Sequence, residues 1–288
     1  MVNLRRLASV SERCVSSVSV PDRSMPRRSL LTRSNVPCEP QDGHDQSRHI
    51  MECMSIDGRD RVVVQWVARF GQLSSSHIRE LVFHGVASAT SSSRSLRRLV
   101  SGNYLLRIER RMVGGSKGGS GQYVYALARK GYYLFHTGRF NPARAINYHS
   151  LAIADSFVIL KRLERSGRFD ITGMSTEPDC HVSVGRYDLT PDMALDIATH
   201  DGSRIRLWLE VDMATETQTQ LKAKLERYWK AYNEADVAVW PIFPKIIFVA
   251  VDEQRAKELR WLISQGSIEA QSLFDVCTRA TLARIFQA

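Results

Sequence analysis

The sequence has few of the residue pairs that build metal or disulfide frameworks. Its five cysteines are scattered, odd in number and without a CxxC pair, and its eight histidines form no HxxxH pair. This pattern argues against a zinc ribbon or a disulfide framework and favours a reducing cytosol. The sequence also has no run of about 18 apolar residues, the length that would span a membrane. We therefore expect a cytoplasmic protein with no membrane partner and no small-molecule substrate.

Acidic side chains are almost missing from residues 61–148, where fourteen Lys and Arg face only Glu80 and Glu109. Residues 1–60 carry nine basic and eight acidic side chains, and residues 149–288 carry seventeen and twenty. The net charge of +10 therefore comes from this middle segment. Because a solvated surface normally mixes both signs, the segment predicts a polyanionic partner, and DNA is the main candidate.

The chain divides by composition into three parts, at residues 1–57, 58–145 and 146–288. The first part is rich in Ser, Arg and Pro and has no sustained apolar period, which predicts a disordered or poorly ordered extension. Translation from Met51 or Met54 is the alternative, and most of this part would then lie outside the native protein. At 288 residues the chain is long enough for two domains, each with its own core.

The second part, residues 58–145, predicts three helices followed by two strands. Apolar side chains recur at helical spacing up to Gly71, and again after a serine in the run 74–76 that can cap a helix. A third, leucine-bearing helix precedes two strands, residues 104–110 and 122–128, which flank a Gly/Ser-rich loop. This order resembles a winged helix-turn-helix, in which the third helix enters the major groove of DNA.

Seven side chains of the second part are candidates for DNA contact. They lie on the third helix or along the wing, and they are Ser91, Arg94, Arg97, Arg98, Arg110, Arg111 and Lys117. The helix residues would face DNA, with Ser95 on the exposed sides beside them, and the wing residues would lie near phosphates. Two alternatives stay open: the arginines only solvate a helix whose leucines pack, or the winged helix mediates protein contacts.

The third part, residues 146–288, predicts an amphipathic helix, three strands, a helix, a buried strand and another helix. We interpret it as an α/β sandwich with a mixed sheet, so the whole chain combines an α+β and an α/β domain. The apolar stretch 272–286 is interpreted as a final helix or as part of a dimer patch. A homodimer therefore stays open.

Carboxylates gather in the third part around Asp192 and the stretch RLWLEVDMATE at residues 206–216. Glu210 and Asp212 lie on one face of the predicted strand, opposite its leucines. Pro191-Asp192 followed by Glu210-Val211-Asp212 resembles the PD-(D/E)XK nuclease pattern. The resemblance implies a restriction-endonuclease-like fold, with Mg²⁺ held by the carboxylates of Asp192 and Glu210 and the Val211 carbonyl. Asp212 is a third candidate metal ligand.

The sequence departs from that pattern at its third position, where Asp212 stands in place of Lys. An added carboxylate can strengthen cation binding, but it cannot polarise a water molecule as an ammonium does. Some members of the fold take the Lys from the next helix, which makes Lys222, Lys224 and also Gln218 candidates to reach the site. The catalytic candidates are therefore Asp192, Glu210, Asp212, Lys222 and Lys224. The alternative is a polar strand edge paired with lysines, in a fold kept only as a scaffold.

The winged helix, the helix near His149 and the series PD…LEVDMATE…KLERY together resemble the replication-relaxation family of bacterial plasmids, phages and integrated elements. The resemblance covers roughly residues 59–255, and its family-like residues are His149, Asp155, Asp192, Glu210, Asp212, Thr215, Glu216, Lys224, Leu225 and Tyr228. It implies a role in replication or DNA relaxation of a mobile element. For His149 itself, a helix-start residue without chemistry is the favoured interpretation.

The sequence therefore predicts a DNA-binding protein of a bacterial mobile element, acting on double-stranded DNA in replication or DNA relaxation. A Mg²⁺-dependent DNA endonuclease or nickase that uses Asp192 and Glu210 is the alternative. A transcriptional regulator that acts through the winged helix alone is a further alternative.

Overall fold

The computed structural model describes residues 56, 58–86, 88–111 and 122–286, and for residues 109–111 it describes the backbone alone. The interpretation of residues 1–57 as a poorly ordered extension therefore lies almost wholly outside the described residues. Within them, no helix combines the length and the apolar character that crossing a lipid bilayer requires.

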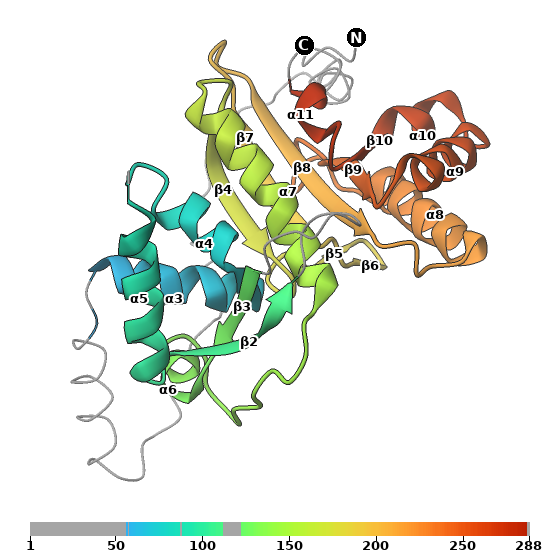
Figure 1. Cartoon of the computed structure of the whole chain (residues 1–288). Helices are drawn as coiled ribbons and strands as arrows, with labels where there is room; N and C mark the ends of the chain where they lie inside the picture. The colour runs from blue at the N-terminus through green and yellow to red at the C-terminus, as the bar shows by residue number, and fades with distance from the viewer. Residues whose placement is uncertain (1–55, 57, 87, 112–121, 287–288) are drawn as a thin grey trace, which may run out of the picture.

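The N-terminal region, residues 58–133, combines helices with a small antiparallel sheet (Figure 1). Its helices are α3 (Gly58–Phe70), α4 (Ser75–Val82), α5 (Ala89–Ser101) and α6 (Arg129–Tyr133). Its strands are β1 (Gln72–Ser74), β2 (Leu105–Arg111) and β3 (Gln122–Leu127), and they lie in the order β1-β3-β2. The predicted order of three helices followed by two strands is confirmed.

Strand β1 is an element that the sequence analysis missed. It pairs antiparallel with β3, and all three of its residues are buried. A strand of three residues is too short to display the alternation by which strands are found in a sequence. Ser74 ends β1 and caps α4, because its side chain accepts a hydrogen bond from the His77 amide at 3.2 Å. The predicted serine cap in the run 74–76 is thereby confirmed.

The C-terminal region, residues 148–286, is built on a five-stranded mixed sheet of order β10-β9-β8-β7-β4. Its strands are β4 (Asp170–Thr176), β7 (Met193–Ala198), β8 (Arg204–Asp212), β9 (Lys245–Ala250) and β10 (Phe274–Thr278). A separate pair consists of β5 (Val182–Val184) and β6 (Tyr187–Leu189). Strands β4, β7 and β8 are antiparallel neighbours, whereas β8, β9 and β10 run parallel. The predicted mixed sheet is confirmed.

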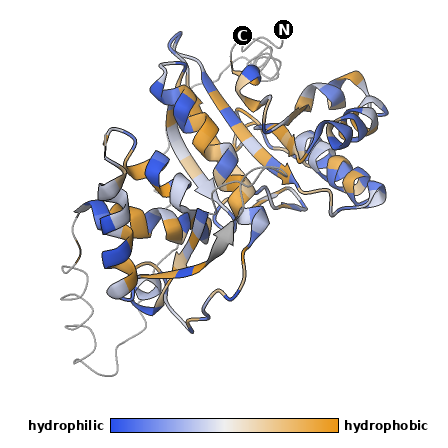
Figure 2. Cartoon of the chain, in the orientation of Figure 1, coloured by the Kyte–Doolittle hydropathy of each residue, from blue (hydrophilic) through white to orange (hydrophobic). Residues whose placement is uncertain are grey.

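Helices cover both faces of this sheet (Figure 1). One face carries α7 (Tyr148–Arg165) and α11 (Leu282–Ile285), and the other carries α8 (Gln218–Glu234), α9 (Glu253–Ser264) and α10 (Ile268–Leu273). Along β8, Leu207 and Leu209 pack in the core under α7, while Trp208 packs in the core under α8. Figure 2 shows that hydrophilic and hydrophobic residues alternate along β8.

Three segments of the C-terminal region differ from the sequence-based expectation. The stretch 272–286 forms no continuous final helix, because Phe274–Thr278 is strand β10, parallel to β9. From the sequence, residues 186–198 are expected to form one of the three strands, but they divide into β6 and β7, because Pro191 between them has no N–H to donate to a ladder. The helix after β8 is expected from about Thr215, but it begins at Gln218, where the Thr217 side chain accepts from the Gln220 amide at 3.3 Å.

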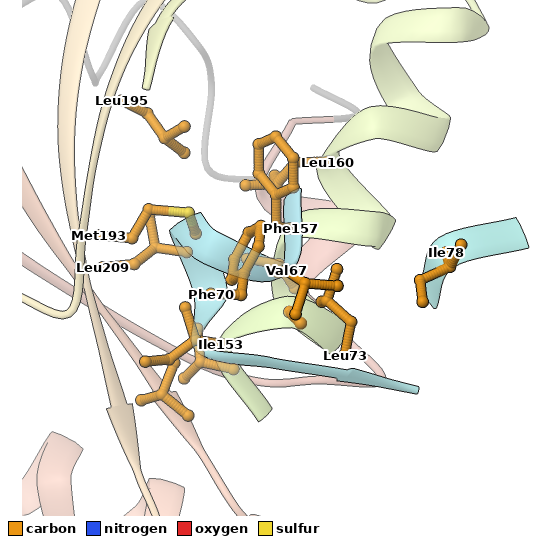
Figure 3. Close-up of a cluster of buried hydrophobic side chains, with 14 of the residues drawn as sticks. Val67, Phe70, Leu73, Ile78, Ile153, Phe157, Leu160, Met193, Leu195 and Leu209 are labelled. Carbon is orange, nitrogen blue, oxygen red and sulfur yellow. The ribbon is translucent and has the colours of Figure 1, made fainter. Parts of the chain in front are cut away.

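The N-terminal region and the five-stranded sheet share one hydrophobic core (Figure 3). Phe157 of α7 lies between them, with its ring centroid 5.4 Å from that of Trp66 and 5.5 Å from that of Phe70. The hydroxyl of Thr176 in β4 also donates to the carbonyl of Arg69 at 2.7 Å. Core side chains therefore pack continuously across the predicted boundary between residues 145 and 146. Helix α7 fixes the helices of the N-terminal region against the sheet of the C-terminal region.

Candidate functional site

Asp192 and Glu210 lie next to each other across the antiparallel strands β7 and β8. Met193, the first residue of β7, pairs with Leu209, so the two acids occupy the next opposed positions. The Asp192 amide donates to the Leu209 carbonyl at 3.1 Å, and its carboxylate accepts from the Val211 amide at 2.6 Å. Both side chains are buried. The register of the two strands therefore brings together the two acids that the PD-(D/E)XK resemblance singled out.

Glu210 is held between two residues of α8, Lys224 and Tyr228. The Lys224 ammonium lies 3.2 Å from one carboxylate oxygen, and the Tyr228 hydroxyl donates to the other. Burial raises the pKa of Glu210 to about 7; the Asp192 charge adds to this rise, and the Lys224 ammonium and the Tyr228 hydroxyl oppose it. Burial likewise raises the pKa of Tyr228. Glu210 is therefore an acid that can exchange a proton near neutral pH.

Asp212, at the position of the missing Lys, is ion-paired with Arg255 of α9. The Arg255 Nε lies 2.5 Å from one carboxylate oxygen of Asp212, and its Nη2 lies 3.3 Å from the other. The same Nη2 donates to the Glu216 carbonyl at 2.7 Å. Both partners of this ion pair are buried. The negative charge that Asp212 adds to the strand is therefore balanced inside the fold.

Of the three candidates on α8, only Lys224 contacts the carboxylates. It lies between Glu210 and Glu216, at 3.2 and 3.1 Å. Lys222 and Gln218 are exposed, and no contact joins either to the three acids among the described residues. The assignment of a catalytic role to Lys222 therefore gains no support from the structure, whereas Lys224 contacts one of the predicted site acids, Glu210.

Asp192, Glu210 and Asp212 do not fit a divalent cation as they are arranged. Lys224 holds the Glu210 carboxylate and Arg255 holds that of Asp212, so a cationic side chain stands where the metal ion would bind. A cation placed there would also meet the repulsion of both positive charges. Asp212 is the least suited of the three, because both of its oxygens accept from the guanidinium.

A different group of donors converges beside Asp192. The ring of His149 and the carboxylates of Glu177 and Asp192 offer one ligand atom each, and these atoms lie within 4.8 Å of one another. His149 Nε2 lies 3.0 Å from Asp192 Oδ1. The hydrogen bond that His149 donates to the Asp192 carboxylate raises the pKa of His149; burial opposes this, and the charges of Asp192, Glu177 and Glu210 add to it. His149 stands at the helix start, as expected, but it also faces the carboxylates.

Glu177 was missed in the sequence analysis. It follows β4 directly, and its amide donates to the Asp192 carbonyl at 3.2 Å. The signal was available only through strand register, because Thr176 pairs with Met193 and so places the next residues of the two strands opposite each other. No spacing motif links these two acids.

Asp155, one of the family-like residues, joins three parts of the chain. Its carboxylate lies 2.7 Å from His77 Nε2 of α4 and 2.6 Å from the Arg279 guanidinium that follows β10. Asp155 itself belongs to α7. It therefore connects α7 to α4 and to the segment that follows β10.

The predicted DNA-contact arginines of α5 divide into two without an ion-pair partner among the described residues and one that is ion-paired. Arg94 and Arg97 are exposed, and no hydrogen bond or ion pair joins them to other described residues. Arg98 is anchored, because its guanidinium lies 2.7 Å from the buried carboxylate of Asp60 on α3. The expectation of an exposed Ser95 is wrong: this side chain is buried and donates to Asp60 at 2.6 Å.

The remaining predicted contact residues are Ser91, Arg110, Arg111 and Lys117. Ser91 is half-buried on α5. Arg110 and Arg111 belong to β2, but their side chains lie outside the described atoms. Lys117 lies outside the described residues altogether. Among the predicted contacts whose side chains the structure describes, Arg94 and Arg97 therefore carry a charge that is open to a partner.

A family model described as Replication-relaxation matches residues 64–243, which is more than half of the chain. The matched range includes α5 as well as Asp192, Glu210 and Lys224. No curated protein and no solved structure matches the chain.

Proposed function

The chain belongs to the replication-relaxation family, and from this premise we propose that it is a DNA-binding protein that acts in replication or DNA relaxation of a bacterial mobile element, a plasmid or a phage. In this proposal the N-terminal region is a winged helix-turn-helix and the C-terminal region a nuclease-like domain. The partner is double-stranded DNA, and α5 is the helix that enters its major groove.

The observation that carries the proposal is the exposed basic face of α5. Arg94 and Arg97 project from a helix whose other side is fixed by buried Leu96 and Leu99. The contact of Ser95 and Arg98 with Asp60 holds the helix against α3. A rigidly supported helix with unpaired guanidinium groups suits phosphate or base contact, because the backbone of α5 needs no ordering on binding and the charges are available to DNA.

The element order of the N-terminal region also supports the proposal. Helix α3, strand β1, helices α4 and α5 and strands β2 and β3 follow one another as in a winged helix, with β1 completing a three-stranded sheet. In the C-terminal region, α7, β4, β7, β8, α8 and β9 follow the helix, three strands, helix and strand of a restriction-endonuclease-like core. The element order selects α5 as the helix that contacts DNA, and the exposure of Arg94 and Arg97 on that helix supports the same choice.

The first experiment measures DNA affinity by fluorescence anisotropy with a labelled duplex at several salt concentrations. We expect Arg94→Ala with Arg97→Ala to weaken binding strongly and to lower the slope of log K against log salt by about 0.9 for each phosphate that the variant no longer neutralises. The matched control is Arg227→Ala with Lys257→Ala, which removes two exposed positive charges from α8 and α9. Equal affinity of the two double variants would contradict the proposed face.

A second candidate function is metal-dependent cleavage of the DNA backbone, with Mg²⁺ the cation that the PD-(D/E)XK resemblance implies. The specific observation in its favour is Lys224, which lies 3.2 Å from Glu210. Lys224 would supply the ammonium that orients an attacking water, in place of the Lys that the pattern puts at Asp212. Glu210 would position this ammonium.

Cleavage is tested with supercoiled DNA in the presence of Mg²⁺, of Mn²⁺ or of chelator, with Asp192→Asn and Lys224→Met beside the wild type. We expect metal-dependent nicking that both variants lose, while their duplex affinity stays at the wild-type level. The control is Lys222→Met, which removes an exposed lysine two residues away on the same helix. Intact DNA in every lane together with normal binding would contradict cleavage and leave a protein that only binds DNA. A transcriptional regulator is one protein of that kind.

A further inference from the structure

Three chain segments bring a histidine and two acids to one point at the edge of the sheet. His149 stands in the first turn of α7, whose cap is the Asn147 side chain, 3.0 Å from the His149 amide. Glu177 follows β4 and Asp192 precedes β7, and the pairing of these strands fixes both backbones. The positions of the donors are therefore set by a helix start and two strand ends, which are rigid elements.

The spacing of the donors suits a metal ion. Two ligands at right angles, each about 2.1 Å from a cation, lie about 3.0 Å apart. His149 Nε2 and Asp192 Oδ1 lie 3.0 Å apart, and no donor of the three lies more than 4.8 Å from another. Two ligands on opposite sides of a cation would lie about 4.2 Å apart, so the His149 and Asp192 donors already have a suitable separation and any remaining adjustment falls on Glu177.

Glu177 is free to make that adjustment. Its side chain is exposed, and no side-chain hydrogen bond or ion pair joins it to another of the described residues. Asp192, in contrast, is held by the Val211 amide at 2.6 Å on the oxygen that faces away from His149. The Asp192 carboxylate is thus oriented by a backbone amide, and the Glu177 carboxylate is exposed without a side-chain partner among the described residues. A cation can therefore enter between them from solvent.

We propose that His149, Glu177 and Asp192 bind a divalent transition-metal cation of the Mn²⁺ class. The inference rests on the proposed cleavage function and names the cation of that site and its ligands. An imidazole nitrogen with carboxylate oxygens suits Mn²⁺ and the later first-row ions, whereas Mg²⁺ strongly prefers oxygen donors and water. The site differs from the Asp192, Glu210 and Asp212 set, whose last two members are held by Lys224 and Arg255.

The test is direct titration of the full chain with Mn²⁺, with the free aqua ion followed by electron paramagnetic resonance. We expect saturable binding, and we expect Glu177→Gln to weaken it by about ten-fold or more, since a ligand contributes at least as much as the groups that support it. The matched control is Asp179→Asn, an exposed acid two residues away. Because Glu177 is exposed and unpaired among the described residues, its substitution should not disturb folding, which circular dichroism checks.

A second measurement reports the histidine itself. Pulsed electron paramagnetic resonance of the bound Mn²⁺ should show a nitrogen coupling that His149→Gln removes and that His181→Gln, an exposed histidine, retains. A nitrogen coupling that persists in His149→Gln would overturn the proposal, and so would wild-type affinity in Glu177→Gln. Competition by Mg²⁺ at concentrations equal to those of Mn²⁺ would overturn the stated class of cation.

The metal site and the cleavage function fail in different ways. Saturable binding that depends on Glu177 and His149, without any nicking of DNA, supports the site and refutes cleavage. Nicking that persists unchanged in Glu177→Gln refutes the site and leaves cleavage standing. Binding is measured without DNA, so neither result depends on having found the right DNA sequence.

Discussion

The two candidate sites hold their charge in opposite ways. On α5, Arg94 and Arg97 are exposed, and no acid among the described residues pairs with them. At the end of β8, Glu210 and Asp212 are buried, and each contacts a basic side chain. An exposed unbalanced charge attracts a partner from solution, whereas a buried charge must be balanced within the fold. The first kind of site is visible in composition, and the second only in three-dimensional contacts.

The largest effect should come from breaking the buried pair of Asp212 and Arg255. We expect Arg255→Ala to lower the free energy of unfolding by about 3–5 kcal/mol, because it leaves the Asp212 carboxylate buried without its partner. Chemical denaturation measures this decrease. Both partners are less than a tenth exposed, at 8% for Arg255 and 6% for Asp212, so solvent cannot take the place of the guanidinium.

The control for Arg255 lies on the same helix. Arg260 pairs with Glu253 at 2.7 Å, and both side chains are about half exposed. Arg260→Ala should therefore cost no more than about 1 kcal/mol. Equal decreases in the two variants would mean that the Asp212 pair is solvated after all, and the contrast between the two sites would then disappear.

A smaller effect is expected from the pH dependence of Glu210. Its pKa is raised from an ordinary value of 4.5 to about 7, so the folded state keeps its proton where the unfolded state has lost it. The stability that Glu210 contributes is therefore full below about pH 4.5 and is lost as pH rises through about 7. The raised pKa of His149 changes stability in the same direction.

Comparison with Glu210→Gln isolates this contribution. Between pH 5 and pH 8 the wild type should lose about 2–3 kcal/mol more stability than the variant, since one pKa unit corresponds to about 1.4 kcal/mol. Denaturation curves at several pH values measure the difference. Glu226→Gln, which replaces an exposed acid on α8, should follow the wild type at every pH. Parallel curves for wild type and Glu210→Gln would show that Glu210 ionises normally.

Much of the fold was predictable because its signals are local. Apolar stripes gave α3, α4, α5, α7 and α8, and alternation along residues 206–212 gave β8. The basic character of residues 61–148 was likewise predictable, because it needs only a count of charges along these 88 residues. These features depend on neighbours in sequence, and the structure confirms the helices and the strand.

The candidate site was only partly predictable, because its contacts join distant segments. Asp212 and Arg255 are 43 residues apart, and Ser95 and Asp60 are 35 apart. Glu177 reaches Asp192 through the register of β4 and β7, which follows from packing of the whole sheet. A single sequence carries no record of register between strands that a loop separates. The two acids of the pattern and Lys224 were therefore found, whereas Arg255 and Glu177 were not.

The smallest of the three effects concerns Asp60, a buried acid inside the basic region. It lies in the first turn of α3, accepts from Ser95 at 2.6 Å and contacts Arg98 at 2.7 Å. We expect Asp60→Asn to cost about 2 kcal/mol of unfolding free energy, because a hydrogen bond to a charged group contributes about 1.5–3 kcal/mol. It should also weaken DNA binding, since the Asp60 carboxylate no longer orients α5.

The sign of the DNA effect separates positioning from charge. Asp60→Asn makes the region more positive, so charge alone would strengthen binding to a polyanion, whereas a change in the orientation of α5 weakens it. Glu80→Gln makes the same change of charge at a side chain that pairs with Arg162 of α7 and does not touch α5. Anisotropy should therefore show weaker binding for Asp60→Asn and unchanged or tighter binding for Glu80→Gln. If both variants bind more tightly, net charge alone governs the interaction. If only Asp60→Asn weakens binding, the basic face of α5 depends on Asp60, a buried acid that is paired with a basic side chain as Glu210 and Asp212 are.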